Sequence, residues 1–171
     1  MKKILAAALA LTLCAGASAE SYTLSGVCTL TFPDDYTIDD VRRDTDDEDW
    51  RFSAYNDYFE LDFYLMEDYG EEDESLFNFS DEELETYIDE VCEANTGDEY
   101  SCEYLKTETI GGVPFVYTIN MDEDDEVAYG CETLANGTCL YFMFYDFEDY
   151  AGGDDVLAEF TEIMSTFVPA V

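Results

Sequence analysis

Carboxylates are the side chains of this sequence best able to do acid–base chemistry. The chain has 43 Asp and Glu residues and no histidine. Without an imidazole, neither a Ser-His-Asp triad nor a Cys-His pair can be built, and a histidine zinc site is excluded as well. The chemistry that remains is a pair of carboxylates, as in glycoside hydrolysis. With so many acids a suitable pair arises by chance, so the composition assigns no catalytic residue. We expect a non-catalytic protein, with a carboxylate-dependent, glycosidase-like hydrolase as the alternative.

Three acidic runs are candidates for cation binding, namely 44–49, 67–74 and 122–126. Their oxygens suit calcium. The first run has the alternating acids that open an EF-hand loop. However, it carries Asp49 where that loop requires Gly and Tyr55 where it requires a bidentate Glu. The EF-hand interpretation therefore fails. We expect no metal-site residue and no cofactor, and at most weak Ca²⁺ association with solvated acidic loops.

Two cysteines flank a predicted β-hairpin. Asn-Gly at positions 136–137 is typical of a two-residue type I′ turn. In that register Cys131 lies opposite Phe142, and Cys139 lies opposite Leu134. The two thiols then point to opposite faces of the sheet and cannot bond.

Cys92 and Cys102 are the better disulfide candidates. Cys92 closes a predicted helix and Cys102 lies just inside the next strand. Five of the six cysteines lie beyond residue 19, so one would remain free or pair between chains. The alternative is five small buried thiols. No Cys-x-x-Cys motif supports a thioredoxin-type site or a zinc knuckle.

The first nineteen residues resemble a bacterial signal peptide. A positive start at 1–3 precedes an apolar stretch at 4–15 and small residues at 17–19, which predicts cleavage after Ala19. The apolar stretch is shorter than the ~20 residues that span a bilayer. Cys14 leaves a lipid-modified N-terminus as an alternative. We therefore predict a secreted or cell-envelope protein, periplasmic or extracellular, with one globular domain over 20–171.

The net charge of the chain indicates which classes of partner it can bind. The 43 acids face six Lys and Arg, for a formal net charge of −37. Nucleic acids and anionic membrane surfaces are repelled by such a chain. A cationic protein is the partner that the charge favours, through electrostatic steering. The oligomeric state is not predicted.

Hydrophobic periodicity indicates an α+β fold. A period of two predicts strands, and a period of 3.6 predicts two amphipathic helices. Ser80 and Glu83 form a capping box at the start of the first helix. We expect a mainly antiparallel sheet of about six strands, with both helices packed on it. The predicted strands are 27–33, 50–55, 58–66, a weaker one at 100–105, 113–119, 127–134 and a central one at 139–147, with helices over 81–94 and from 154 to just before Pro169.

The chain resembles the PsbP-like family of small secreted bacterial proteins. The resemblance covers about 22–168 and rests on four features: Phe-Pro at 32–33, Ile-Gly-Gly-Val-Pro-Phe at 110–115, the Asn-Gly hairpin, and the closing helix at 163–167. It implies an α/β/α sandwich. Members are mostly non-enzymatic subunits or uncharacterised envelope proteins, and no functional residue carries over. We therefore expect a non-catalytic binding or interaction domain of unknown ligand.

The charge itself yields a prediction. Crowded carboxylates repel one another in the compact state, so their folded pKa values should on average be raised. Stability from raised groups is present at low pH and is lost as pH rises through the raised values. Because salt screens the repulsion, the melting temperature at neutral pH should rise with added NaCl, and more with CaCl₂. Calorimetric melts that respond to neither salt would contradict this prediction.

Overall fold

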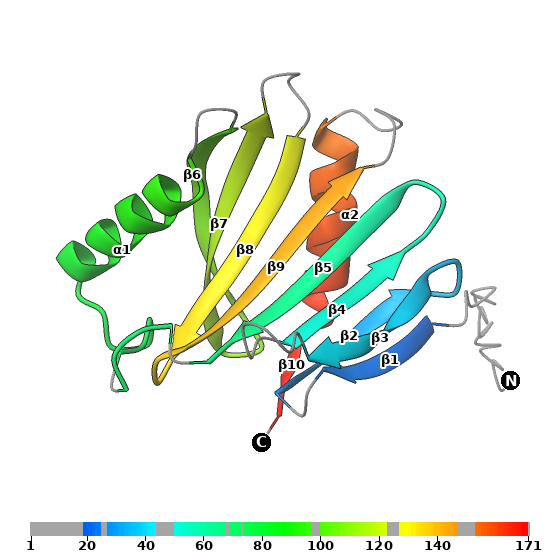
Figure 1. Ribbon diagram of the computed structural model, residues 1–171, viewed down its shortest axis with the longest axis horizontal. Coiled ribbons are helices and arrows are strands. Elements are labelled where there is room, and N and C mark those ends of the chain that lie inside the picture. The colour runs from blue at the N-terminus through cyan, green and yellow to red at the C-terminus, as the bar shows by residue number, and fades with distance from the viewer. Residues whose placement is uncertain are drawn as a thin grey trace, which may run out of the picture.

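The computed structural model describes residues 19–24, 27–43, 50–67, 69–72, 74–96, 100–122, 127–146 and 153–170. The stretch 1–18 of the predicted signal peptide lies outside these residues, as does the acidic run 44–49. Seven strands form one antiparallel sheet in the order β3-β4-β5-β9-β8-β7-β6 (Figure 1). Their bounds are β3 (Thr37–Arg43), β4 (Trp50–Tyr55), β5 (Phe59–Met66), β6 (Tyr100–Ile110), β7 (Val113–Asp122), β8 (Val127–Ala135) and β9 (Thr138–Asp146).

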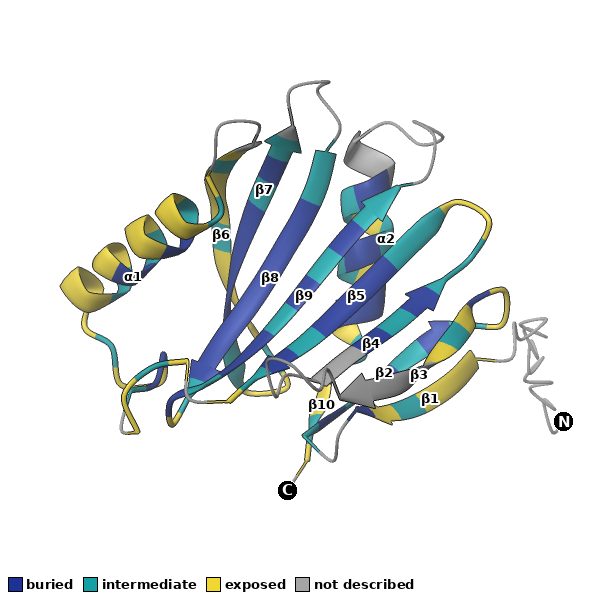
Figure 2. Ribbon diagram, viewed as in Figure 1, coloured by how far each residue is buried: buried dark blue, intermediate teal, exposed yellow. Residues whose placement is uncertain are grey.

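One face of this sheet holds the main core. It is covered by helix α2 (Gly153–Ser165) and by a three-stranded sheet of order β1-β2-β10, with bounds β1 (Ala19–Leu24), β2 (Cys28–Pro33) and β10 (Val168–Pro169). Aromatic rings join the layers. Phe144 of β9 stacks on Phe160 of α2 with centroids 5.3 Å apart, and Phe32 of β2 lies 5.9 Å from Phe52 of β4. Figure 2 shows the central strands as largely buried.

Helix α1 (Asp81–Ala94) packs on the other face through a smaller cluster. Its buried residues, Tyr87 and Val91, belong to one buried cluster with Val116 of β7, Leu134 of β8 and Cys139 of β9. The helix lies at the β6 end of the sheet, and most of its surface is exposed (Figures 1 and 2). The sandwich is therefore asymmetric, with a broad layer on one face and one lightly packed helix on the other.

Several sequence predictions are confirmed. The α+β class holds, and β9 is central, between β5 and β8. The hairpin turn has positive φ at both Asn136 (53°) and Gly137 (77°), and it sets Cys131 opposite Phe142 and Cys139 opposite Leu134. Both hydrogen bonds of the Ser80 capping box are present.

The strand count was too low. The described residues form ten strands in two sheets rather than about six in one. Strand β3 has the sequence Thr-Ile-Asp-Asp-Val-Arg-Arg, whose polarity hides it, as expected for an edge strand. Strand β10 has only two residues. Strand β6 continues to Ile110 because a bulge between Tyr104 and Lys106 restores its pairing with β7.

The capping box gives a testable stability contribution. Replacing Ser80 with Ala removes the hydroxyl that accepts the Glu83 N–H at 3.3 Å. The free energy of unfolding should fall by about 1 kcal/mol, measured by urea denaturation. Ser165→Ala, in the last turn of α2, is the matched control, because its hydroxyl only donates to the Glu162 carbonyl. Equal losses in the two variants would contradict a capping role.

Candidate functional site

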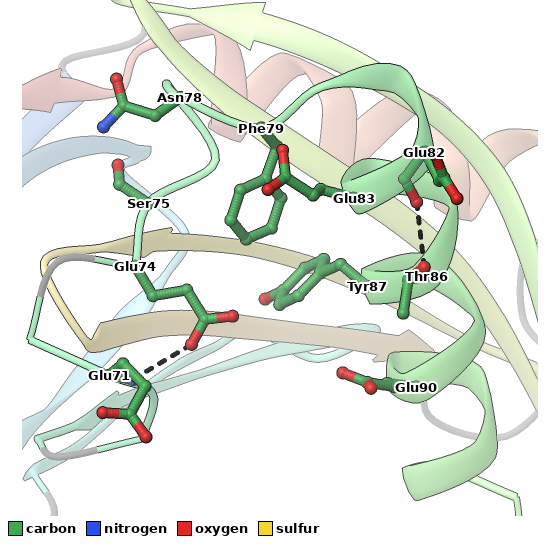
Figure 3. A pocket seen from close by; sticks show the side chains of 10 residues that line it. All are labelled: Glu71, Glu74, Ser75, Asn78, Phe79, Glu82, Glu83, Thr86, Tyr87 and Glu90. Atoms are coloured by element: carbon green, nitrogen blue, oxygen red, sulfur yellow. Dashed lines mark hydrogen bonds between the residues drawn. The ribbon is translucent and has the colours of Figure 1, made fainter.

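A pocket of about 620 Å³ lies between helix α1 and the connection that leads to it from β5. The connection supplies the lining residues between 71 and 79, and α1 supplies those between 82 and 90. Figure 3 shows the two walls facing each other, with Tyr87 projecting between them. The lining residues are Glu71, Glu74, Ser75, Asn78, Phe79, Glu82, Glu83, Thr86, Tyr87 and Glu90. Five of these ten are carboxylates and none is basic, so the pocket attracts positive charge.

The local structure fixes two of these carboxylates. Glu74 accepts the backbone N–H of Glu71 at 3.1 Å, which closes the loop before α1. Glu83 accepts the Ser80 N–H at 2.7 Å, and the hydrogen bonds from Ser80, backbone first, hold the pKa of Glu83 below its usual value. Both groups are acceptors with structural roles. Glu71, Glu82 and Glu90 are exposed and complete the acidic rim.

An aromatic pair forms the apolar part of the pocket. The rings of Phe79 and Tyr87 meet edge to face with centroids 5.7 Å apart. Tyr87 is buried, and its hydroxyl donates to the Glu132 carboxylate on β8. Burial, and then the charge of Glu132, raises the pKa of Tyr87 far above its ordinary value. The ring therefore stays neutral, as an aromatic wall beneath the acidic rim.

Glu132 is a buried acid below the pocket. It is 4% exposed, and this burial raises its pKa, although the hydrogen bond from Tyr87 opposes the shift. The charge of Glu132 also affects the pKa of Tyr69. Burial, and then this charge, raises the Tyr69 pKa to about 12. Glu132 does not line the pocket. The carboxylate supports Tyr87 from below and adds negative potential beneath the pocket.

A second buried acid, Asp62 of β5, lies on the same sheet face. It accepts hydrogen bonds from the hydroxyls of Tyr145 (2.9 Å) and Tyr64 (3.2 Å). Strand β9 separates it from Glu132, because Asp62 pairs with Met143 and Glu132 pairs with Tyr141. Strand spacing and rise place their Cα atoms about 12 Å apart. Asp62 is bound by two tyrosines and Glu132 by one, and neither acid lines the pocket, so these two do not form the paired carboxylates of a glycosidase cleft.

The disulfide candidates are neighbours in space. Cys92 lies near the end of α1 and Cys102 lies on β6, both as free thiols that interact through their side chains. Cys131 and Cys139 are buried in different clusters on opposite faces. Across the described residues, no group of three or more His, Cys, Asp or Glu has the arrangement of a metal site. Weak calcium association stays a prediction.

Some of the pocket residues lie in segments that the sequence analysis identified, although it did not predict a pocket there. Glu71 and Glu74 belong to the acidic run 67–74, and Tyr87 belongs to the apolar stripe of α1. Glu132 was missed. The available signal was an acid inside a predicted central strand, where a charged residue needs a partner if it is buried. None of the described helices is long and apolar enough to cross a membrane.

Comparison with known proteins shows the fold. The chain is similar to the solution structure of cyanobacterial PsbP (CyanoP) from Synechocystis sp. PCC 6803, with a TM-score of 0.58 and 17% identity. The match covers 96% of this chain and 98% of that one, and nine chains with solved structures match in all. No protein-family model and no curated protein matches the sequence. The PsbP-like fold expected from the sequence is therefore confirmed, and the similarity extends no further than the fold.

The burial of Glu132 predicts a pH-dependent stability. Its folded pKa is raised, so its contribution is present at low pH and is lost as pH rises through the raised value. Glu132→Gln keeps an acceptor for Tyr87 without the buried charge. At pH 7 the variant should be more stable than the wild type by on the order of 1 kcal/mol, or about 2–4 °C in melting temperature. The gain should vanish near pH 4.

Glu85→Gln is the matched control, because Glu85 is an exposed acid on α1. It removes one charge without affecting the buried cluster. An equal gain in both variants would mean that general charge repulsion, rather than burial of Glu132, causes the effect.

Proposed function

We propose that this chain is a non-catalytic binding domain of the secretome or cell envelope. Its acidic pocket receives a positively charged side chain of a partner, a lysine or arginine on a cationic protein. The observation that carries the proposal is the composition of the pocket, which combines five carboxylates with an aromatic pair and no base.

The chemistry of the walls fits an alkyl-ammonium or guanidinium group. The apolar stem of Lys or Arg packs on Phe79 and Tyr87, while its charged head stays among the carboxylates of the rim. A cation over an aromatic face gains about 0.5–2 kcal/mol, more as water is excluded. Glu132 strengthens the negative potential behind the Tyr87 ring. The pocket volume of about 620 Å³ suits a side chain or a short segment rather than a whole domain.

The remainder of the molecule supports rapid encounter with such a partner. The formal net charge of −37 extends an attractive field to any basic surface. Such steering raises the association rate most at low ionic strength. The predicted leader, with cleavage after Ala19, would bring the domain to the compartment where it meets secreted proteins.

The test compares two triple variants of equal charge. In Glu71→Gln/Glu82→Gln/Glu90→Gln the exposed acids of the rim are neutralised. In Asp34→Asn/Asp57→Asn/Glu103→Gln three exposed acids elsewhere are neutralised. Affinity for a synthetic lysine octapeptide is measured by calorimetry at low salt. The rim variant should bind at least about tenfold more weakly than the wild type, whereas the control should change about twofold or less, since distant charges are screened.

Three further comparisons test the proposal and show which results would contradict it. Equal losses in the two triple variants would reduce the interaction to non-specific charge attraction and overturn the assignment of the pocket. Competition by millimolar CaCl₂ but not by NaCl of equal ionic strength would favour the loosely cation-binding alternative. Phe79→Leu, which keeps an apolar volume without a ring, should weaken octapeptide binding by about two- to fivefold if the aromatic wall takes part.

A further inference from the structure

Helix α1 is the weakly held element of the fold. Seven of its fourteen residues are acidic, none is basic, and no basic residue lies in its last turn to complement the helix dipole. Only Tyr87 and Val91 are buried. Helix α2, in contrast, buries Val156, Phe160, Ile163 and Met164 in the main core. An element with few buried apolar contacts and unfavourable charges opens at lower free energy than the rest of the structure.

A pair of thiols lies where the C-terminal end of α1 packs on β6. Cys92 lies in the last turn of the helix and Cys102 lies on the edge strand β6, on which the helix packs. Both side chains are partly buried. Burial, and then the hydrogen bond with the Cys92 thiol, raises the pKa of the Cys102 thiol to about 12. Cys102 shares its sheet face with Asn120, its partner across the ladder, and its thiol also bonds to Thr118.

The position of this pair completes a set of attachments along α1. The N-terminal end is fixed by the Ser80 capping box and by the contact of Phe79 with Tyr87. The middle is fixed by the bond from Tyr87 to Glu132. Beyond Val91, the Cys92 side chain of α1 interacts with the Cys102 side chain of β6. A covalent bond at that point would therefore restrain the last turn of the helix directly after Val91.

We propose that Cys92 and Cys102 form a reversible dithiol–disulfide pair that fastens the C-terminal end of α1 to β6 and thereby controls how firmly α1 forms its wall of the acidic pocket. The second part of this proposal rests on the proposed function. The first part, the bond and its effect on α1, does not.

The reaction is a two-electron oxidation by a disulfide oxidant, such as the active-site disulfide of an envelope thiol oxidase or oxidised glutathione. A thiolate attacks the oxidant disulfide and gives a mixed disulfide, and the second thiolate then displaces the reduced sulfur. Two S–H bonds are lost and one S–S bond forms. The two electrons pass to the oxidant disulfide, and its two leaving thiolates take up the two protons that the cysteines release, which gives two thiols. Because little Cys102 thiolate exists at neutral pH, uncatalysed oxidation should accelerate as pH rises.

The bond is tested on the chain 20–171 with oxidised glutathione as the probe oxidant. Thiols left free are alkylated, and the protein is cleaved after glutamate, which separates residue 92 from residue 102 at Glu93 and Glu99. A linked peptide pair containing both cysteines, with three alkylated cysteines elsewhere, is the expected result. Five alkylated cysteines after complete equilibration would overturn the proposal, as would a bond between other cysteines.

The mechanical effect is tested by amide hydrogen exchange and thermal melting. Oxidation should slow exchange in the last two turns of α1 at least about tenfold and raise the melting temperature on the order of 5–10 °C, as expected for a short closed loop. Cys92→Ser, Cys102→Ser and the double variant should each lose this gain to the same extent. Additive losses, or losses that persist under reducing conditions, would indicate packing effects and overturn the proposal.

Octapeptide binding to the reduced and oxidised forms separates the two proposals. Oxidation should tighten binding by up to about twofold, because the minority of the reduced protein that has α1 lifted from the sheet then becomes competent to bind. A bond that forms and slows exchange but leaves measurable binding unchanged would overturn control of the pocket. If neither form binds the octapeptide, the proposed function fails, while the linked peptides and slowed exchange still establish the fastening of α1.

Discussion

Aromatic burial between the large sheet and its main covering layer is the interaction on which the rest of the molecule depends. The rings of Phe142, Phe144 and Phe160 are completely buried there. Burying one such ring removes about 150–250 Å² from water, worth roughly 4–6 kcal/mol at ~25 cal/mol/Å². Two exposed carboxylates 4 Å apart repel by only about 1 kcal/mol in water. A modest number of well-packed rings can therefore hold a highly charged surface together, provided that the charges remain in solvent.

Two acids among the described residues are buried, and both lie on the other face of the sheet. Asp62 and Glu132 are both buried there. Asp62 accepts hydrogen bonds from the hydroxyls of Tyr64 and Tyr145, and Glu132 accepts one from Tyr87. Phenol donors stabilise a carboxylate without introducing a positive charge, which suits a chain with so few bases. The acidic pocket is connected to this arrangement, because Tyr87, which forms part of its aromatic wall, donates the hydrogen bond to Glu132. The site and the packing of α1 are consequently parts of one polar–aromatic network.

The features that were predicted correctly from the sequence are those that depend on neighbouring residues. The alternation in 27–33 and 58–66, the capping box at Ser80 and the Asn-Gly turn each depend on neighbouring residues, and each is present in the structure. Strand β10 was missed because its two residues become a strand only by pairing with β2, far away in the sequence. Strands β1 and β3 were also missed, although each pairs with the strand that follows it, and the polar sequence of β3 gives no hydrophobic alternation. The pocket was missed for a related reason. Its rim combines a loop and a helix that look like ordinary solvated acidic segments until the fold sets them face to face.

The order of strands has a consequence for how the chain reaches this structure. Strand β9 lies between β5 and β8, so the β3–β5 and β6–β8 meanders can join only when β9 is available. The β5–β9 ladder pairs Phe59 with Asp146 and Met66 with Cys139, contacts that are far apart along the chain. Such non-local pairing makes closure slow. The large sheet thus remains incomplete until residues 138–146, in the last quarter of the chain, are available, while the many like charges oppose premature collapse.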